Sequence, residues 1–166
     1  MSKNPLEDKI EKLSISTLYD RFSLDIYRYA FSLLKNREEA KDAMQEVFVK
    51  YVEHENSFKE QCSQKTWLFI IARNYCYNRL KSSDYKCRDY SEEEIKEEYE
   101  FNVDWKISIS DALMKLNREQ NELIFLVDYA GYTYKEIAEL TNLSLENVKI
   151  KIFRARQELR NYLKES

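Results

Sequence analysis

The chain has 166 residues, with one Gly, one Pro, 34% charged residues and a formal net charge of -3. A β-rich fold would need many turn residues, so this composition argues against one and predicts an all-helical protein of one ordinary domain or two small ones. No apolar run is long enough for a membrane span and no leader peptide is visible, so we expect a cytoplasmic protein without membrane insertion.

The net charge conceals a strong asymmetry along the chain. Residues 89–104 carry eight acidic side chains and one basic side chain, whereas residues 1–88 carry 16 basic and 13 acidic ones. Local basic patches in an otherwise balanced chain suit a nucleic-acid-binding protein better than a wholly basic chromatin protein. We therefore predict a helical domain at 1–84, an acidic linker at 85–104 and a second helical domain at 105–166, each domain with only a modest core.

Two amphipathic helices are predicted near the start of the chain. Apolar side chains recur every three or four residues from about Ile15 to Leu34 and again from about Arg37 to His54. On the second helix, the polar residues Asp42, Gln45 and Glu46 lie off the apolar stripe. They form either a solvated face or a docking face, and periodicity alone does not separate these interpretations.

A third helix is predicted from about Thr66 to Leu80, after a polar loop whose only large apolar side chain is Phe58. Aromatic and basic residues are interleaved here, and the segment from Arg73 to Arg88 holds five basic side chains against Asp84 alone. Such a composition suits a groove that follows a phosphate backbone while bases stack on aromatic rings. The alternative is that Trp67 and its apolar neighbours only form the core.

The second domain is predicted to contain about four helices. One opens the domain, and the next begins at Asn117, with Gly131 in the turn after it, where a positive φ is often required. Thr133 and Glu136 have the spacing of a capping box, so a further helix should start at Tyr134.

The last predicted helix is capped by Ser144 and makes a helix-turn-helix with the helix before it. Its apolar residues recur every three or four positions from Leu145 to Leu163. Five basic side chains against two acidic ones lie from Glu146 to Arg160, on both flanks of the apolar stripe, where the phosphates beside a DNA groove would meet them. Ile150 lies almost opposite the stripe and is suited to contact a thymine methyl in the major groove. The alternative is a basic flank that is only a solvated face.

Neither a metal site nor a catalytic centre is predicted. Cys62, Cys76 and Cys87 lack the paired spacing of a structural zinc site, and His54 is the only histidine. No Gly-rich phosphate loop or catalytic triad is recognisable, so we expect no enzyme activity, cofactor, metal or small-molecule substrate.

Three motifs, in this order, resemble those of bacterial RNA polymerase sigma factors, most closely the small two-domain extracytoplasmic-function (ECF) group. The first is Asp42-Ala43-Met44-Gln45-Glu46-Val47-Phe48, the second combines Trp67-Leu68 with Ile71-Ala72-Arg73-Asn74, and the third lies between Leu116 and Leu159. The resemblance covers the chain from about Leu18 to Leu163. It implies an all-α protein of two domains, sigma region 2 and the region 4 helix-turn-helix, that gives core polymerase its promoter specificity.

The resemblance also implies which surfaces bind each partner. In the family the first motif docks on the largest polymerase subunit, the loop and third helix open the promoter at the minus-10 element, and the helix-turn-helix reads the minus-35 element. The core-polymerase candidates are Asp42, Gln45, Glu46 and Phe48. The minus-10 candidates are Phe58, Lys65, Trp67, Arg73, Asn74, Asn78, Arg79 and Lys81. The minus-35 candidates are Ser144, Glu146, Asn147, Lys149, Ile150, Lys151 and Arg154. An anti-sigma factor that covers both domains is a further implied partner.

The chain departs from the family pattern at positions that would determine which promoter DNA sequence it recognises. Asn78 stands where the family often has Asp, and the segment from Glu146 to Lys151 replaces a common Gly-Thr-Val-Lys-Ser-Arg sequence. Glu146 can accept a hydrogen bond from cytosine and Asn147 can pair with adenine, so a family promoter sequence is not transferred to this chain. A stand-alone helix-turn-helix regulator would explain residues 105–166 equally well, but it leaves the first two motifs unexplained and would bind DNA tightly by itself.

Overall fold

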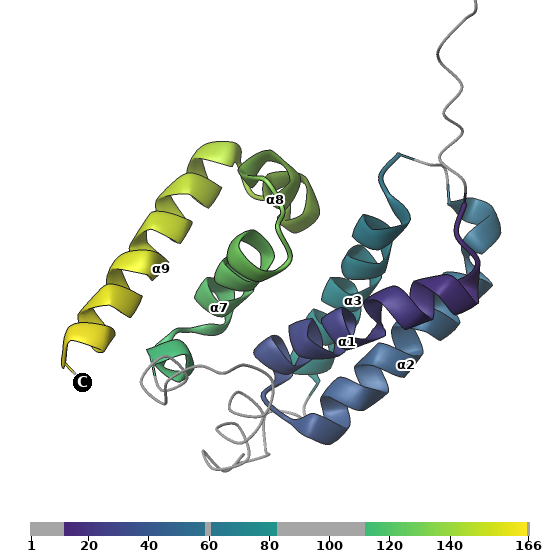
Figure 1. The fold of residues 1–166 in the computed structure, drawn as a ribbon, viewed down its shortest axis with the longest axis horizontal. Coiled ribbons are helices and arrows are strands. Elements are labelled where there is room, and N and C mark those ends of the chain that lie inside the picture. The colour runs from purple at the N-terminus through teal and green to yellow at the C-terminus, as the bar shows by residue number, and fades with distance from the viewer. Residues whose placement is uncertain (1–11, 59–60, 83–111, 166) are drawn as a thin grey trace, which may run out of the picture.

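The computed structural model describes residues 12–58, 61–82 and 112–165, and within these ranges every regular element is helical, which confirms the all-α fold. The predicted acidic linker at 85–104 and the residues that open the second domain lie outside the described residues. Figure 1 shows the long elements in chain order. They are α1 (Ile15–Leu34), α2 (Arg37–Glu53), α3 (Gln64–Lys81), α7 (Arg118–Ile124), α8 (Tyr134–Thr141) and α9 (Leu145–Glu165).

Short polar side chains set the starts of the first three helices. Ser14, Asn36 and Ser63 each accept a hydrogen bond from the backbone N–H three residues later. At the end of α1, Lys35 adopts the left-handed conformation with φ 55, and its N–H donates to the Phe31 carbonyl. The predicted bounds of α1 and α2 are confirmed within one residue, whereas α3 begins earlier than predicted because Ser63 caps it.

Two capping boxes organise the second half of the chain. Asn117 and Gln120 form one at the start of α7, and Thr133 and Glu136 form the predicted one at the start of α8. Gly131, in the turn between these helices, has φ 75, as its position in the sequence predicted. Local sequence therefore accounts for both helix starts and for the turn that separates them.

A π-helical segment, η2 (Phe125–Tyr129), follows α7 directly, and hydrophobic periodicity did not predict it. The Ala130 N–H donates to the Phe125 carbonyl over 2.8 Å, which is the spacing of a π turn. A π turn is wider than an α turn, so it shifts the side chains that follow it. Phe125, the first residue of η2, and Tyr132, three residues after its end, both contact the ring of Phe69 on α3.

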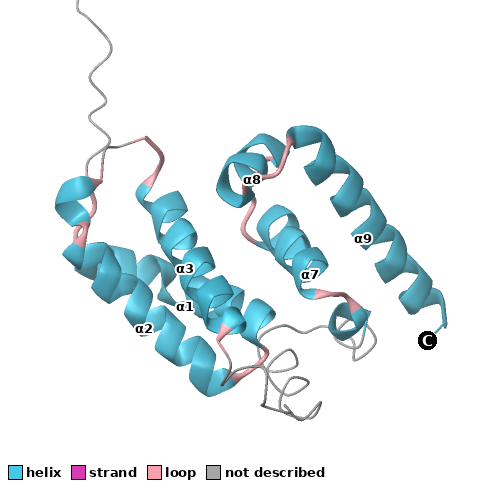
Figure 2. Cartoon of the chain, turned by 180° about the vertical axis from the view of Figure 1, so that it is seen from behind, coloured by secondary structure: helices cyan, strands magenta, loops and turns pink. Residues whose placement is uncertain are grey.

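The helices of the two halves share one core. Helices α1, α2 and α3 pack against one another, and α9 packs along α7 and α8, as Figures 1 and 2 show from opposite sides. Helix α7 also contacts α1, and α8 contacts α3. The larger cluster of buried apolar side chains extends from Leu18 on α1 to Ile152 on α9. A smaller, separate cluster, formed by Leu113, Leu116, Ile124 and Ala155, belongs to the second half alone. The larger core therefore spans both halves of the described residues, and the second half adds a small core of its own.

Aromatic rings lie at the centre of this shared core. Tyr29 and Phe69 are fully buried, with ring centroids 5.2 Å apart in an edge-on arrangement. Phe125 approaches Tyr29 at 5.7 Å, and Tyr132 approaches Phe69 at 5.6 Å. Each such pair contributes about 0.5–1.5 kcal/mol beyond the apolar area that it buries. This ring cluster joins α1 and α3 to the second half of the chain.

The pH dependence of stability should report on the buried end of α1. Burial, together with the Arg118 guanidinium, lowers the pKa of Lys35 from 10.5 to about 8. Between pH 8 and pH 10 the unfolded chain therefore binds more protons at this lysine, so the contribution of Lys35 to the free energy of unfolding is expected to rise with pH. Cys76, Tyr29 and Tyr132 contribute with the opposite sign at alkaline pH, because burial raises their pKa values and the folded chain keeps protons that the unfolded chain loses.

Denaturant titrations at several pH values measure this profile. The matched variant is Lys35→Asn, whose side chain is neutral and tolerates the left-handed backbone. The difference in unfolding free energy between the wild type and this variant should therefore rise between pH 8 and pH 10, because the other titrating groups are the same in both proteins. A difference that does not change with pH would contradict the assignment to Lys35.

Candidate nucleic-acid interface

The helix-turn-helix consists of α8 and α9. Asn142 ends α8 in the left-handed conformation with φ 59, and the Ser144 side chain accepts a hydrogen bond from the Asn147 N–H over 3.1 Å. One side of α9 packs on α7 and α8 through Val148 and Ile152, both fully buried. The predicted start of α8 at Tyr134 and the predicted Ser144 cap are therefore confirmed.

The other side of α9 is exposed along its first turns. Six of the seven minus-35 candidates are exposed, and Lys151 is half-buried because its Nζ pairs with Glu119 Oε2 at 2.8 Å. The exposed six are Ser144, Glu146, Asn147, Lys149, Ile150 and Arg154. This side therefore presents acceptor, donor and apolar groups together, which is the chemistry that reads base edges in a major groove.

Phe153 is an exposed residue of α9 that the sequence interpretation missed. It is 62% exposed, and Ile150, one turn before it, is 41% exposed. A spacing of three residues places the two side chains on one side of the helix, and Lys149 lies four residues before Phe153. The sequence already indicated that Phe153 is exposed, because this residue falls outside the apolar stripe that contains Val148 and Ile152. Ile150 and Phe153 form an exposed apolar pair among basic residues.

The polymerase candidates on α2 divide into exposed and buried residues. Asp42 and Gln45 are exposed and Glu46 is half-buried, so these three present one polar face. Phe48 is only 6% exposed, and its ring packs edge-on against Tyr19 with centroids 5.0 Å apart. Phe48 therefore supports the helix from beneath and is not part of the polar face. Val49 and Val52, which follow on the exposed side of α2, are 50% and 52% exposed.

Three basic minus-10 candidates on α3 are engaged in contacts within the protein. Arg79 pairs with Glu39 of α2 at 2.8 Å, and Arg73 pairs with Glu122 of α7 at 2.8 Å. Lys65 Nζ donates to the Ala130 carbonyl over 2.8 Å. The first contact lies within the three-helix bundle, whereas the other two cross to the second half of the chain.

The remaining minus-10 candidates form two groups. Asn74, Asn78 and Lys81 are exposed, and their spacing of four and three residues places them on one side of α3. The rings of Phe58 and Trp67 stack on each other with centroids 4.6 Å apart and planes 15° apart. The aromatic pair therefore lies beside the start of α3, and a polar face extends from it along the helix.

Cys62 and Cys76 lie in the part of the chain that the structure describes, and both are free thiols. No group of three or more potential metal ligands occurs among the described residues. Burial raises the pKa of Cys76 well above its ordinary value, so its thiol stays protonated and unreactive. None of the helices in the described ranges combines the length and the apolar character that a membrane span requires.

Comparisons with known proteins agree along the length of the chain. The Sigma-70 region 2 family matches residues 18–85, and the Sigma-70 region 4 family matches residues 106–159. RNA polymerase sigma factor YlaC of Bacillus subtilis (strain 168) is 29% identical over 162 residues, which cover 92% of this chain and 94% of that protein. ECF RNA polymerase sigma factor SigM of the same strain is 27% identical over 155 residues, covering 89% and 94%.

Solved structures share the fold. Sigma factor RpoE of Bartonella quintana, in complex with anti-sigma factor NepR, gives a TM-score of 0.72 at 21% identity, covering 90% of this chain and 96% of that one. CnrH, in complex with the cytosolic domain of CnrY, gives 0.69 at 23% identity, covering 92% and 88%. With both sigma regions matched in order and relatives aligned nearly end to end, the chain belongs to the sigma-70 family of RNA polymerase sigma factors, in its ECF group.

Proposed function

We propose that this sigma factor, which directs promoter recognition by core RNA polymerase and is not an enzyme, does so through three separate surfaces. The polar face of α2 docks on core polymerase, the exposed side of α3 with the Phe58–Trp67 stack meets the minus-10 element, and α9 reads the minus-35 element. The observation that carries the proposal is the division of α9 into a buried apolar side and an exposed side with Glu146, Lys149 and Arg154.

The three surfaces differ in chemistry as their partners do. Asp42 and Glu46 make the polymerase face acidic, which would repel DNA and favours a protein partner. Lys81 and the amides of Asn74 and Asn78 supply donors for phosphates and unpaired bases along α3. The alternative of a stand-alone helix-turn-helix regulator is not favoured, since it assigns no role to the acidic face of α2.

Run-off transcription with purified protein, core polymerase and a genomic promoter library tests the proposal. Transcripts from promoters with a shared two-element motif are expected only when protein and polymerase are both present. Tight, sequence-specific DNA binding by the protein alone, without transcripts, would instead support the stand-alone regulator. The same assay supplies the promoter sequence that the next experiment needs.

Replacing Ile150 should change which minus-35 sequences are preferred. In Ile150→Ala, the loss of a contact to a thymine methyl is expected to reduce discrimination at one base position by about five-fold, or about 1 kcal/mol. Transcription from a randomised minus-35 library gives the ranking of sequences. Leu163→Ala is the control, because Leu163 is a partly exposed apolar residue at the far end of α9. An unchanged ranking in the Ile150 variant would show that Ile150 does not contact the minus-35 bases in the groove.

We also propose a cytoplasmic location and an anti-sigma partner. Core polymerase and chromosomal DNA, the two proposed binding partners, are both cytoplasmic in bacteria. The structure of sigma factor RpoE in complex with anti-sigma factor NepR supports the partner proposal, because RpoE shares the fold of this chain. Such a partner should suppress run-off transcription when it is added before polymerase.

A further inference from the structure

Gln64, in the first turn of α3, contacts two other parts of the chain through its side-chain amide. The Leu13 N–H donates to Oε1 over 2.9 Å, and Nε2 donates to the Leu13 carbonyl over 3.1 Å. The same Nε2 donates to the Tyr51 hydroxyl over 2.8 Å. Leu13 precedes α1, and Tyr51 lies in the last turn of α2. One half-buried amide therefore connects the chain before α1 and the end of α2 to the start of α3.

The aromatic rings beside this amide form a continuous series. Tyr51 is 1% exposed, and its ring centroid lies 4.9 Å from that of Trp67, which in turn stacks on Phe58. A buried tyrosine hydroxyl needs a hydrogen-bond partner, and Gln64 supplies the donor. Because the Tyr51 ring is held at its hydroxyl end, it gives Trp67 a fixed surface to pack against. The orientation of the Phe58–Trp67 stack therefore depends on Gln64.

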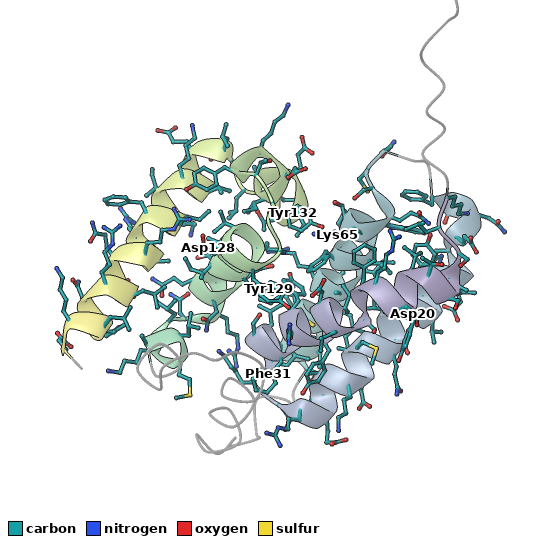
Figure 3. The ribbon with its side chains drawn as sticks, in the orientation of Figure 1. Asp20, Phe31, Lys65, Asp128, Tyr129 and Tyr132 are labelled. Carbon is teal, nitrogen blue, oxygen red and sulfur yellow. The ribbon has the colours of Figure 1, made fainter. Side chains whose placement is uncertain are left out.

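The two residues after Gln64 are held by the second half of the chain. Lys65 donates to the Ala130 carbonyl, and its Nζ lies 4.9 Å from the centroid of the Tyr132 ring (Figure 3). The Thr66 hydroxyl donates to the Tyr132 hydroxyl over 3.3 Å. The turn that precedes the aromatic stack is thus fixed from two directions, and Gln64 provides the contacts to the chain before α1 and to α2.

Helix capping does not account for the contacts of Gln64. The Ser63 side chain already caps α3, since its Oγ accepts a hydrogen bond from the Thr66 N–H over 3.1 Å. A side chain that only stabilised the start of this helix would bond within its own turn. The Gln64 amide instead bonds to Leu13 and Tyr51, outside α3.

We propose that Gln64 is a positioning residue for promoter opening, which holds the Phe58–Trp67 stack in the orientation that receives an unpaired base of the minus-10 element. A base stacks on the face of an aromatic ring, so a tilted ring binds it less well. Binding side chains are held precisely only when neighbouring packing and hydrogen bonds lock them, and Gln64 with Tyr51 supplies that support here. The inference rests on the proposed function of the stack.

The inference is tested with Gln64→Ala, which removes the amide and leaves a residue well suited to a helix. Tyr51→Phe removes only the hydroxyl that accepts from Gln64 and keeps the ring. Lys12→Ala is the matched control in the chain before α1. It breaks the ion pair of Lys12 with Glu55, which measures 2.9 Å, and leaves the amide contacts of Gln64 in place.

Two measurements separate the position of the stack from its use. Acrylamide quenching of Trp67 fluorescence, in a Trp105→Phe background that leaves one tryptophan, reports how accessible the stack is. A fluorescent adenine analogue in the minus-10 element of the promoter brightens when it unstacks, so it gives the rate of opening by saturating holoenzyme. Affinity for core polymerase and the thermal unfolding midpoint are measured on the same proteins.

In Gln64→Ala, promoter opening is expected to slow about ten-fold and quenching of Trp67 to increase, while the affinity for core polymerase stays unchanged. Tyr51→Phe should show smaller changes in the same direction. The double variant should open no more slowly than Gln64→Ala, since both side chains act through one network. Lys12→Ala should match the wild type. A lower unfolding midpoint in Gln64→Ala with wild-type opening by the folded holoenzyme would show a purely structural role and overturn the inference.

Phe58→Ala distinguishes failure of the inference from failure of the proposed function. Slow opening in Phe58→Ala, with wild-type opening or wild-type quenching in folded Gln64→Ala, would overturn the positioning role and leave the minus-10 role of the stack in place. Wild-type opening in Phe58→Ala would contradict that minus-10 role, and the inference would fail with it. If Gln64→Ala did not fold, Tyr51→Phe would decide, and wild-type opening there would overturn the positioning role.

Discussion

Glu46→Lys is expected to weaken binding to core RNA polymerase by about 30-fold or more, or about 2 kcal/mol, because it reverses a charge at the centre of the proposed docking face. Glu46 directly follows Gln45 on α2. Asp42 lies about one turn before it and Val49 about one turn after it. Titration of core polymerase against the fluorescently labelled protein gives the affinity. Run-off transcription should fall in parallel, while the thermal unfolding midpoint stays close to that of the wild type.

Lys41→Glu is the control for this change. Lys41 is exposed on the same helix, and five residues of α-helix place it roughly 140° around the axis from Glu46. It pairs only loosely with Glu38, at 3.4 Å, so its reversal should cost little stability. Near-wild-type affinity is expected for this variant. Full affinity in Glu46→Lys would instead place the docking surface away from α2.

Phe69→Ala is expected to remove about 3–5 kcal/mol of unfolding free energy, because it empties the centre of the shared core. Phe69 is fully buried and contacts the rings of Tyr29, Phe125 and Tyr132. A domain of ordinary stability has about 5–15 kcal/mol in total, so this loss is a large part of it. Because the rings come from both halves, α7 and α8 should loosen along with α3. Urea titration measures the free energy, and hydrogen exchange locates the loosened helices.

Phe153→Ala is the matched change on the surface. Its ring is 62% exposed, so the free energy of unfolding should stay within about 0.5 kcal/mol of the wild-type value. Comparing Phe69→Ala with Phe153→Ala shows how much of the lost unfolding free energy comes from lost core packing and how much from removing an aromatic side chain. Normal hydrogen exchange in α7 and α8 of the Phe69 variant would contradict the shared core and leave two independent ones.

Much of the secondary structure could be predicted from neighbouring residues. The Thr133–Glu136 capping box, the Ser144 cap and Gly131 with its positive φ all occur where the sequence placed them. These features depend on residues three or four positions apart, so local hydrogen bonds and backbone geometry decide them. The π segment η2 was missed, since its residues continue the apolar pattern of an ordinary helix.

The candidate interface was predictable where helix periodicity alone determines exposure. On α9, the stripe that includes Val148 and Ile152 is buried, and Lys149, Ile150 and Arg154 are exposed, as expected. Phe48 shows the limit of a motif, because a residue grouped with the polar docking face lies beneath it against Tyr19. A motif identifies a segment of helix, whereas the neighbouring helices decide which of its residues are covered.

The sequence by itself determined the all-α fold class, most helix starts, the helix-turn-helix and the resemblance to sigma factors, because each depends on composition or on short-range spacing. Only the tertiary structure decided the partners of Glu122 and Arg73, which are 49 residues apart in the chain. Periodicity shows that a charged residue lies on a given side of a helix, but it does not show which other helix approaches that side. The closed arrangement of the two halves is therefore a property of long-range packing among α1, α3 and α7.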